Sequence, residues 1–102
     1  MNRLPVSWTR QARCALDGYA RTLALDSQAA ARRFVVAVLA AAEGLSILPE
    51  RGRRIPEDES ETFRESYWKS YRIIYVVRAD QVVVADVRHQ RQELTECYLR
   101  AL

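Results

Sequence analysis

Two apolar runs near the end of the chain constrain its fold more than any other feature, YRIIYVVR at residues 71–78 and QVVVADVR at residues 81–88. Both are rich in β-branched and aromatic residues, which favour strands, and only a short polar break separates them. Strands joined by so short a connection pair antiparallel as a hairpin. Because TFRES at residues 62–66 is a third strand-like run, we predict a three-stranded antiparallel meander.

Alternation along a strand assigns its side chains to the two faces of this sheet. One face of the hairpin is apolar throughout, and its residues are Tyr71, Ile73, Tyr75, Val77, Val83, Ala85 and Val87. The other face has an apolar centre and a charged end, and its residues are Ile74, Val76, Val82, Val84, Arg72, Asp86 and Arg88. We predict that the first face, with Tyr75 and Val87, is buried. The second face, with Ile74 and Val84, is expected to be half-exposed and open to a partner.

Helical spacing dominates the first half of the chain. LPVSW at residues 4–8 alternates like a strand, and Thr9 can cap the helix that follows. Asp26 or Ser27 can cap a second helix, which Pro49 ends. The apolar stripes of the two helices are Ala12, Leu16, Tyr19 and Leu23, then Phe34, Val38, Ala41, Leu45 and Leu48. Such closely joined helices are antiparallel, so we predict an αα-hairpin packed on the apolar face of the sheet.

The remaining segments complete a single domain over residues 1–102. Residues 51–61 combine the basic RGRR with the acidic EDESE and are predicted to be a loop, whereas residues 92–102 return to helical spacing. A hydrophobic content of 49% with 28% charged residues is that of an ordinary globular domain. The predicted class is α+β: an N-terminal strand, a helical hairpin on one face of a small, mostly antiparallel sheet, and a short C-terminal helix.

Composition excludes several classes of function. Cys14 and Cys97 lack the neighbours that zinc binding or redox exchange requires, and no phosphate loop is present, so we expect no metal or cofactor. The longest apolar stretch, residues 34–42, is shorter than the roughly 20 residues that cross a bilayer, so we expect a cytoplasmic protein and no membrane contact. Although the net charge is +3, the acidic EDESE beside the basic patch argues against direct nucleic-acid binding.

In their order and spacing, these segments resemble the ParE/RelE superfamily of type II toxin–antitoxin toxins, nearest its ParE-like plasmid-stabilisation branch. The resemblance rests on DSQAAARRF, LSILPERGRRIPE, FRE before YRIIYVV, and VVVADVRHQR. It implies a RelE/ParE-like fold and a toxin held inactive in a hetero-oligomer with a ParD-like antitoxin. We predict antitoxin contacts at six apolar positions, Leu16, Phe34, Val38, Ile74, Val76 and Val84.

The resemblance leaves two mechanisms open. RelE-like members cleave messenger RNA on the ribosome, which requires a base, an acid and cationic groups around the phosphate. The candidates for such a site are Arg72, His89, Glu65, Arg51 and Arg53. ParE-like members are implied to poison DNA gyrase by binding it, and they commonly end the last strand with a histidine followed by an arginine, as RHQR does here.

We predict the second mechanism, a gyrase inhibitor without catalytic residues. Lys69 is the only lysine among 16 basic residues, and arginine can donate hydrogen bonds but cannot accept a proton near neutral pH. The predicted target-binding residues are Arg72, Arg88, His89, Arg91 and Tyr98. Structural roles remain open as well, because His89 can bond to backbone at a strand end and Arg72 can pair with Asp86 or Glu65.

Overall fold

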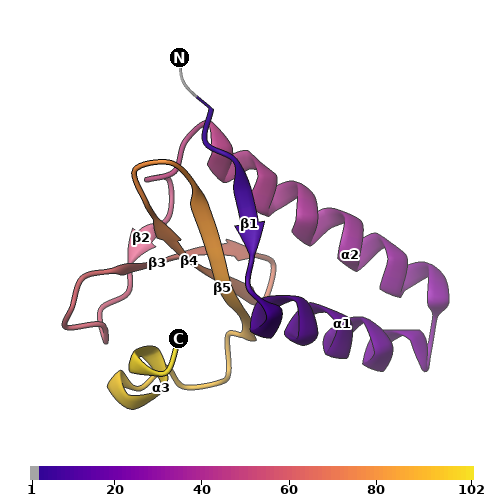
Figure 1. The fold of residues 1–102 in the computed structure, drawn as a ribbon. Helices are drawn as coiled ribbons and strands as arrows, with labels where there is room; N and C mark the ends of the chain where they lie inside the picture. Colours follow the sequence, from indigo (N-terminus) through magenta and orange to yellow (C-terminus); the bar gives the residue numbers. More distant parts are fainter. Residues whose placement is uncertain (1–2) are drawn as a thin grey trace.

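The computed structural model describes residues 3–102, which form a mixed five-stranded sheet with two long helices on one face and a short helix on the other (Figure 1). The elements are β1 (Val6–Trp8), α1 (Arg10–Ala24), α2 (Gln28–Glu43), the 3-10 helix η1 (Gly44–Ser46), β2 (Arg53–Arg54), β3 (Phe63–Trp68), β4 (Tyr71–Val77), β5 (Val82–His89) and α3 (Glu96–Arg100). The predicted α+β class is confirmed. Within the described residues, no helix is both long enough and apolar enough to span a membrane.

The sheet has the strand order β1-β5-β4-β3-β2. The predicted meander of β3, β4 and β5 is antiparallel, whereas β1 pairs in parallel with β5 at one edge. The two-residue strand β2 pairs with β3 at the other edge, inside the segment predicted to be a loop. The first strand therefore lies beside the last strand. The helical hairpin that follows β1 packs on one face of the sheet.

Both helix starts are capped as predicted. The Thr9 side chain accepts a hydrogen bond from the backbone N–H of Ala12 at 3.1 Å, and Ser27 accepts one from Ala30 at 3.1 Å. These caps satisfy N–H groups that have no partner inside the helix. The second helix ends at Glu43, before the predicted end at Pro49, because the chain tightens into η1.

The main core lies between the helical hairpin and the sheet. Its buried residues are Ala12, Leu16, Phe34, Val38, Ala42, Ile73 and Val84. Tyr75 is buried in the adjoining cluster with Leu45 and Val82. Val87 is buried and pairs with Ile73, so it faces the hairpin as predicted. Ile74 packs on the opposite face with Ile55, Leu94 and Leu99, again as predicted.

The predicted faces of Val82, Val83 and Val84 are wrong because β5 contains a bulge. Ile74 pairs with Asp86 but the next residue of β4, Tyr75, pairs with Val84, so Ala85 is the extra residue. An extra residue reverses the alternation on one side of it. Val82 and Val84 consequently lie in the core beneath the hairpin, and Val83, which pairs with Val76, lies on the opposite face.

Tyr75 fixes the segment that precedes β2. Its hydroxyl donates to the carbonyl oxygen of Pro49 at 2.7 Å and accepts from the backbone N–H of Gly52 at 2.9 Å. A Cβ atom at Gly52 would lie 2.5 Å from the carbonyl oxygen of Glu65 and from the Tyr75 hydroxyl. Only glycine fits there, so the backbone passes close to β3 and delivers Arg53 to the sheet.

The acidic loop is organised by one buried carboxylate, Asp58. It accepts hydrogen bonds from the Ser60 hydroxyl at 2.5 Å and from the backbone N–H groups of Ser60, Thr62 and Phe63 at 3.1, 2.9 and 2.7 Å. Burial by itself would raise the pKa of Asp58, but the hydrogen bonds outweigh it and lower the pKa below its ordinary value. The loop before β3 is therefore a fixed turn.

Replacing Asp58 by asparagine is expected to cost about 1.5 kcal/mol of unfolding free energy at pH 7, because the charged acceptor is lost. A lowered pKa stabilises the fold above the unfolded-state value, about 3.9, and that contribution disappears as the pH falls through the lower folded-state value. Asp58→Asn should therefore show a shallower acid loss of stability in urea titrations between pH 7 and 2. The control, Glu59→Gln at an exposed neighbour, should follow the wild type. Equal acid profiles for Asp58→Asn and wild type would contradict this role.

Candidate functional site at the end of the sheet

The register places two rows of charged side chains next to each other on the face that carries α3. Residues paired across neighbouring strands point to the same face, as do alternate residues along one strand. The first row consists of Arg53, Glu65, Ile74 and Asp86 on β2 to β5. The second row consists of Tyr67, Arg72 and Arg88 on β3 to β5. Two carboxylates thus lie among three arginines.

Glu65 is the most buried charged group of this face, at 2% exposure. Its Oε2 accepts a hydrogen bond from Nε of Arg53 at 2.6 Å, and its Oε1 lies 3.8 Å from Nη1 of Arg72. The hydrogen bond to Glu65 raises the pKa of Arg53 above its ordinary value. Because an unpaired buried charge is costly, the two arginines are what allow a carboxylate here. Of the two expected partners of Arg72, the structure supplies Glu65.

Asp86 is held instead by residues from α1 and α3. The Tyr98 hydroxyl donates a short hydrogen bond to Oδ2 of Asp86, and Nε2 of Gln11 donates to the same oxygen at 3.1 Å. Burial, together with the hydrogen bond to Asp86, raises the pKa of Tyr98 well above its ordinary value, so the phenol stays protonated at neutral pH. The Arg88 guanidinium lies over the Tyr98 ring, 4.1 Å from its centre. Asp86, Tyr98 and Arg88 together fasten α3 to the end of the sheet.

Arg72 and Arg88 face each other across β4 and β5, an arrangement that is repulsive unless carboxylates offset it. Nη2 of Arg72 donates to the carbonyl oxygen of Gln90 at 2.6 Å. The Nε atoms of both arginines are buried and have no hydrogen-bond partner within the described residues. Each guanidinium therefore retains donor capacity that the described residues do not use.

A polar pocket of about 300 Å³ opens beside Arg72. It is lined by Glu57, Arg72, Gln90, Arg91, Gln92, Glu93 and Leu94. The pocket brings two of the predicted target-binding residues, Arg72 and Arg91, to one place. With Arg88 and Tyr98 on the same face, four of the five predicted target-binding residues gather at this end of the sheet.

His89 lies on the other face. It pairs with Tyr71, its ring stands edge-on to the Tyr71 ring at 5.3 Å, and Tyr71 packs against the core beneath the hairpin. Its Nδ1 accepts a hydrogen bond from the backbone N–H of Arg91 at 3.1 Å. Its own backbone N–H donates to the hydroxyl of Tyr19 at 3.2 Å. Bonding to backbone at a strand end is the structural role that the sequence had left open for this residue.

The five candidate nuclease residues lie in three separate places. Arg53, Glu65 and Arg72 are in contact, as described above, whereas His89 is on the far face. Arg51 is exposed and its Nη1 atom lies close to Gly44 at the end of α2. Among residues 3–102, no group of three or more histidine, cysteine, aspartate or glutamate side chains could hold a metal ion.

The six predicted antitoxin contacts, Leu16, Phe34, Val38, Ile74, Val76 and Val84, are all buried. The expected half-exposed face is therefore a correction: α3 and Ile55 cover Ile74, and the bulge turns Val84 into the main core. Leu16 and Phe34 still line hollows at the surface of the hairpin. The large apolar side chains that the second helix exposes are Val36, at 67%, and Leu39, at 43%.

Sequence analysis did not identify Gln11 or the residues at the pocket rim as part of this site. Gln11 contacts Asp86 across 75 positions of sequence, and no local pattern signals such a contact. Gln90, Gln92 and Glu93 follow the last strand, so their closeness to RHQR was the one available signal.

Comparison with known proteins places the chain in a family. Residues 6–94 match the model of the ParE toxin of type II toxin–antitoxin system, parDE. A search of curated proteins found no match. Among solved structures, the chain is similar to one described as a chromosomal ParDE TA system from P. aeruginosa, with 19% identity, a TM-score of 0.68 and coverage of 85% of this chain and 96% of that chain.

The chain is also similar to one from the toxin–antitoxin complex RelBE2 of Mycobacterium tuberculosis, with 26% identity, a TM-score of 0.68 and coverage of 90% of this chain and 97% of that chain. The two structures share the fold described here. Because the family match spans most of the sequence, this protein belongs to the ParE toxin family of type II toxin–antitoxin systems.

Proposed function

We propose that this toxin inhibits DNA gyrase by binding it, through the arginine-rich end of the sheet, and that a ParD-like antitoxin neutralises it. The observation that carries the proposal is the separation of the two candidate bases. Glu65 is buried between Arg53 and Arg72, whereas the His89 ring lies on the opposite face. A base and an acid must reach the same phosphate to cleave RNA, so the burial of Glu65 and its separation from His89 support binding over cleavage.

The same groups suit recognition of a protein surface. Arg72, Arg88 and Arg91 present donors at one end of the sheet, and Tyr98 adds an aromatic face fixed by Asp86. Arginine and tyrosine are the residues that most often dominate protein–protein binding energy. Guanidinium groups bind planar acceptors such as carboxylates. We propose these four side chains as the target-binding surface. His89, the fifth predicted residue, lies on the other face at the end of β5 and would contact the target only at the margin of this surface.

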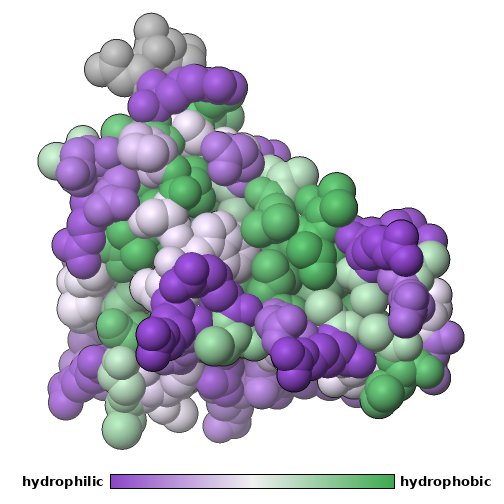
Figure 2. All heavy atoms as spheres, turned by 45° about the vertical axis from the view of Figure 1, so that its right-hand side comes forward, coloured by the Kyte–Doolittle hydropathy of each residue, from purple (hydrophilic) through white to green (hydrophobic). Residues whose placement is uncertain are grey.

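The antitoxin is proposed to cover the helical hairpin. Hydrophobic side chains gather over this part of the surface, between charged groups (Figure 2). Val36 and Leu39 are exposed on this hairpin, and Leu16 lines a hollow together with Leu39. Phe34 lines a separate hollow on the side of α2 that faces the β3–β4 turn. Apolar surface of this kind is typical of a face that a partner buries. Of the other four proposed antitoxin contacts, Val38 and Val84 would support such a surface from within. Ile74 and Val76 lie on the opposite face of the sheet and do not contribute to it.

The second candidate function, a ribosome-dependent mRNA endonuclease, is kept because Arg53, Glu65 and Arg72 do lie in contact. Cell phenotype separates the two. Gyrase inhibition should produce filamentous cells and an SOS response while translation continues, whereas a nuclease should halt protein synthesis first.

His89→Gln distinguishes the two mechanisms at one residue. Glutamine keeps hydrogen bonding but cannot take up a proton, so a binding toxin should retain most of its growth inhibition. We expect induced expression of His89→Gln to inhibit growth within about threefold of wild type, since no proton transfer is lost. If the variant folds, binds antitoxin and is harmless while the wild type cleaves ribosome-bound message, the nuclease function replaces the one proposed here.

A further inference from the structure

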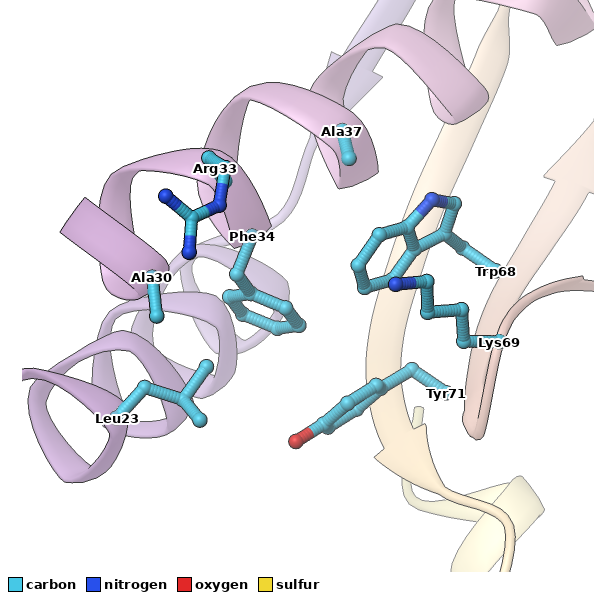
Figure 3. Close-up of a pocket in the computed structure, with 8 residues that line it drawn as sticks. All are labelled: Leu23, Ala30, Arg33, Phe34, Ala37, Trp68, Lys69 and Tyr71. Carbon is cyan, nitrogen blue, oxygen red and sulfur yellow. The ribbon is translucent and has the colours of Figure 1, made fainter. Parts of the chain in front are cut away.

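A second hollow, distinct from the arginine-rich end of the sheet, opens between α2 and the turn that joins β3 to β4 (Figure 3). Its volume is about 480 Å³. The residues that line it are Leu23, Ala30, Arg33, Phe34, Ala37, Trp68, Lys69 and Tyr71. A hollow of this size admits one or two large apolar side chains.

The hollow has an aromatic wall and a cationic rim. The Phe34 ring centre is 5.7 Å from that of Trp68 and 4.8 Å from that of Tyr71, so the three rings form one surface. Arg33 extends from α2 on one side, and the ammonium of Lys69 points in from the β3–β4 turn on the other (Figure 3). None of the described residues that line the hollow carries a carboxylate. The lining is complementary to an apolar group that carries a negative charge beside it.

Lys69 has a backbone conformation that is uncommon for a lysine. It is the only lysine of the chain, and its φ of 50° puts it in the left-handed region that glycine or asparagine occupies at less cost. This conformation brings its ammonium to 5.0 Å from the centre of the Trp68 ring. Glycine at position 69 would leave the turn less strained. The turn therefore does not account for a lysine at this position, whereas the positive charge at the edge of the hollow does.

The neighbouring sheet edge can receive a peptide. Strand β2 pairs with β3 only at Arg64 and Glu65, so residues 66–68 of β3 have no partner strand on that side within the described residues. An extended segment can add to such an edge by backbone hydrogen bonds and place alternate side chains in an adjacent pocket. This feature favours a polypeptide over a small molecule as the occupant.

We propose that the hollow binds a segment of the antitoxin in which an apolar side chain enters the aromatic wall and an adjacent carboxylate lies between Arg33 and Lys69. The inference rests on the proposed antitoxin partner and adds the place and the chemistry of its contact. A segment leaving the hollow past Tyr71 reaches His89 on the same face of the sheet. If it continued round the end of β5, the same segment would meet the arginines of the opposite face.

The test measures the dissociation constant between purified toxin and the antitoxin encoded beside it, by calorimetry. Lys69→Gly removes the ammonium and relieves the turn, so affinity should fall about tenfold while the melting temperature stays equal or rises. Lys69→Glu and Arg33→Glu should weaken binding further. Arg78→Glu, an exposed arginine in the β4–β5 turn, is the matched charge reversal and should change affinity by less than about threefold.

A second readout uses tryptophan emission. Trp8 and Trp68 are the only tryptophans, so a Trp8→Phe background makes Trp68 the sole reporter, and its emission should shift when antitoxin binds. Lys69→Gly with wild-type affinity, or a Trp68 emission that is unchanged on binding, would overturn the proposal. So would Lys69→Glu losing gyrase inhibition with antitoxin affinity intact, because the hollow would then belong to the target. A wild-type toxin that does not bind the antitoxin would contradict the proposed function itself.

Discussion

Reversing the charge of both Arg88 and Arg91 is expected to lower gyrase inhibition by at least about 100-fold, because two charge-assisted hydrogen bonds contribute roughly 1.5–3 kcal/mol each. The Arg88 guanidinium lies over the Tyr98 ring, and the exposed Arg91 lines the polar pocket beside Arg72. Both side chains lie on the surface proposed to contact the target. The measurement is the concentration of purified toxin that halves gyrase supercoiling.

The matched control carries the same change of charge at Arg10 and Arg78, which are exposed and lie outside both proposed surfaces. It should inhibit gyrase within about threefold of wild type, as expected for surface charges. Because Arg88 is close to Asp86, the melting temperature and antitoxin affinity of the Arg88→Glu, Arg91→Glu chain are measured as well. A folded, antitoxin-binding double variant that still inhibits gyrase at the wild-type concentration would contradict the proposed target surface.

Glu65→Gln is expected to lower the unfolding free energy by about 3 kcal/mol, because removing one partner of a buried pair leaves the other without its counter-charge. The Arg72 side chain is only 14% exposed and would lose the carboxylate 3.8 Å away. The comparison is Arg53→Gln at the exposed partner, which should cost less than Glu65→Gln because Arg72 still offsets the charge of Glu65. Urea denaturation at pH 7 measures both. If both variants lost the same unfolding free energy, the burial of Glu65 would not be the reason why Glu65→Gln destabilises the fold.

The elements that sequence predicted correctly are those fixed by local chemistry. Thr9 and Ser27 cap helices because their own side chains reach backbone N–H groups three residues on. Tyr75 and Ile74 are assigned to opposite faces because β4 alternates without interruption through Val77. These features depend on neighbours a few residues away, and the printed sequence contains all of them.

The bulge at Ala85 could not be predicted in this way. Residues 82–85 are Val, Val, Val and Ala, so either face of this stretch is apolar and the pattern carries no signal of which residue is extra. Only packing beneath the hairpin decides it, where Val84 meets Leu16 and Phe34 in the core. Without the bulge, Val82 and Val84 were assigned to the half-exposed face, but in the structure both are buried in the core.

The candidate sites depend on contacts between distant segments. The hydrogen bond from Gln11 to Asp86 and the contact of Phe34 with Trp68 join helices to strands far along the chain. Sequence reasoning identified the arginines of RHQR because they stand together, but not the partners that orient them. It also did not identify Lys69 and Trp68 as site residues. The hollow that they line forms between α2 and the β3–β4 turn, which are far apart in the sequence.

The most direct test of the proposed function is a supercoiling assay with purified toxin, gyrase and relaxed plasmid, run in parallel with a translation reaction containing ribosomes and a defined message. The account predicts that supercoiling is inhibited, that added antitoxin restores it, and that the message stays intact. Cleavage of the message on ribosomes, with gyrase unaffected at the same toxin concentration, would contradict it.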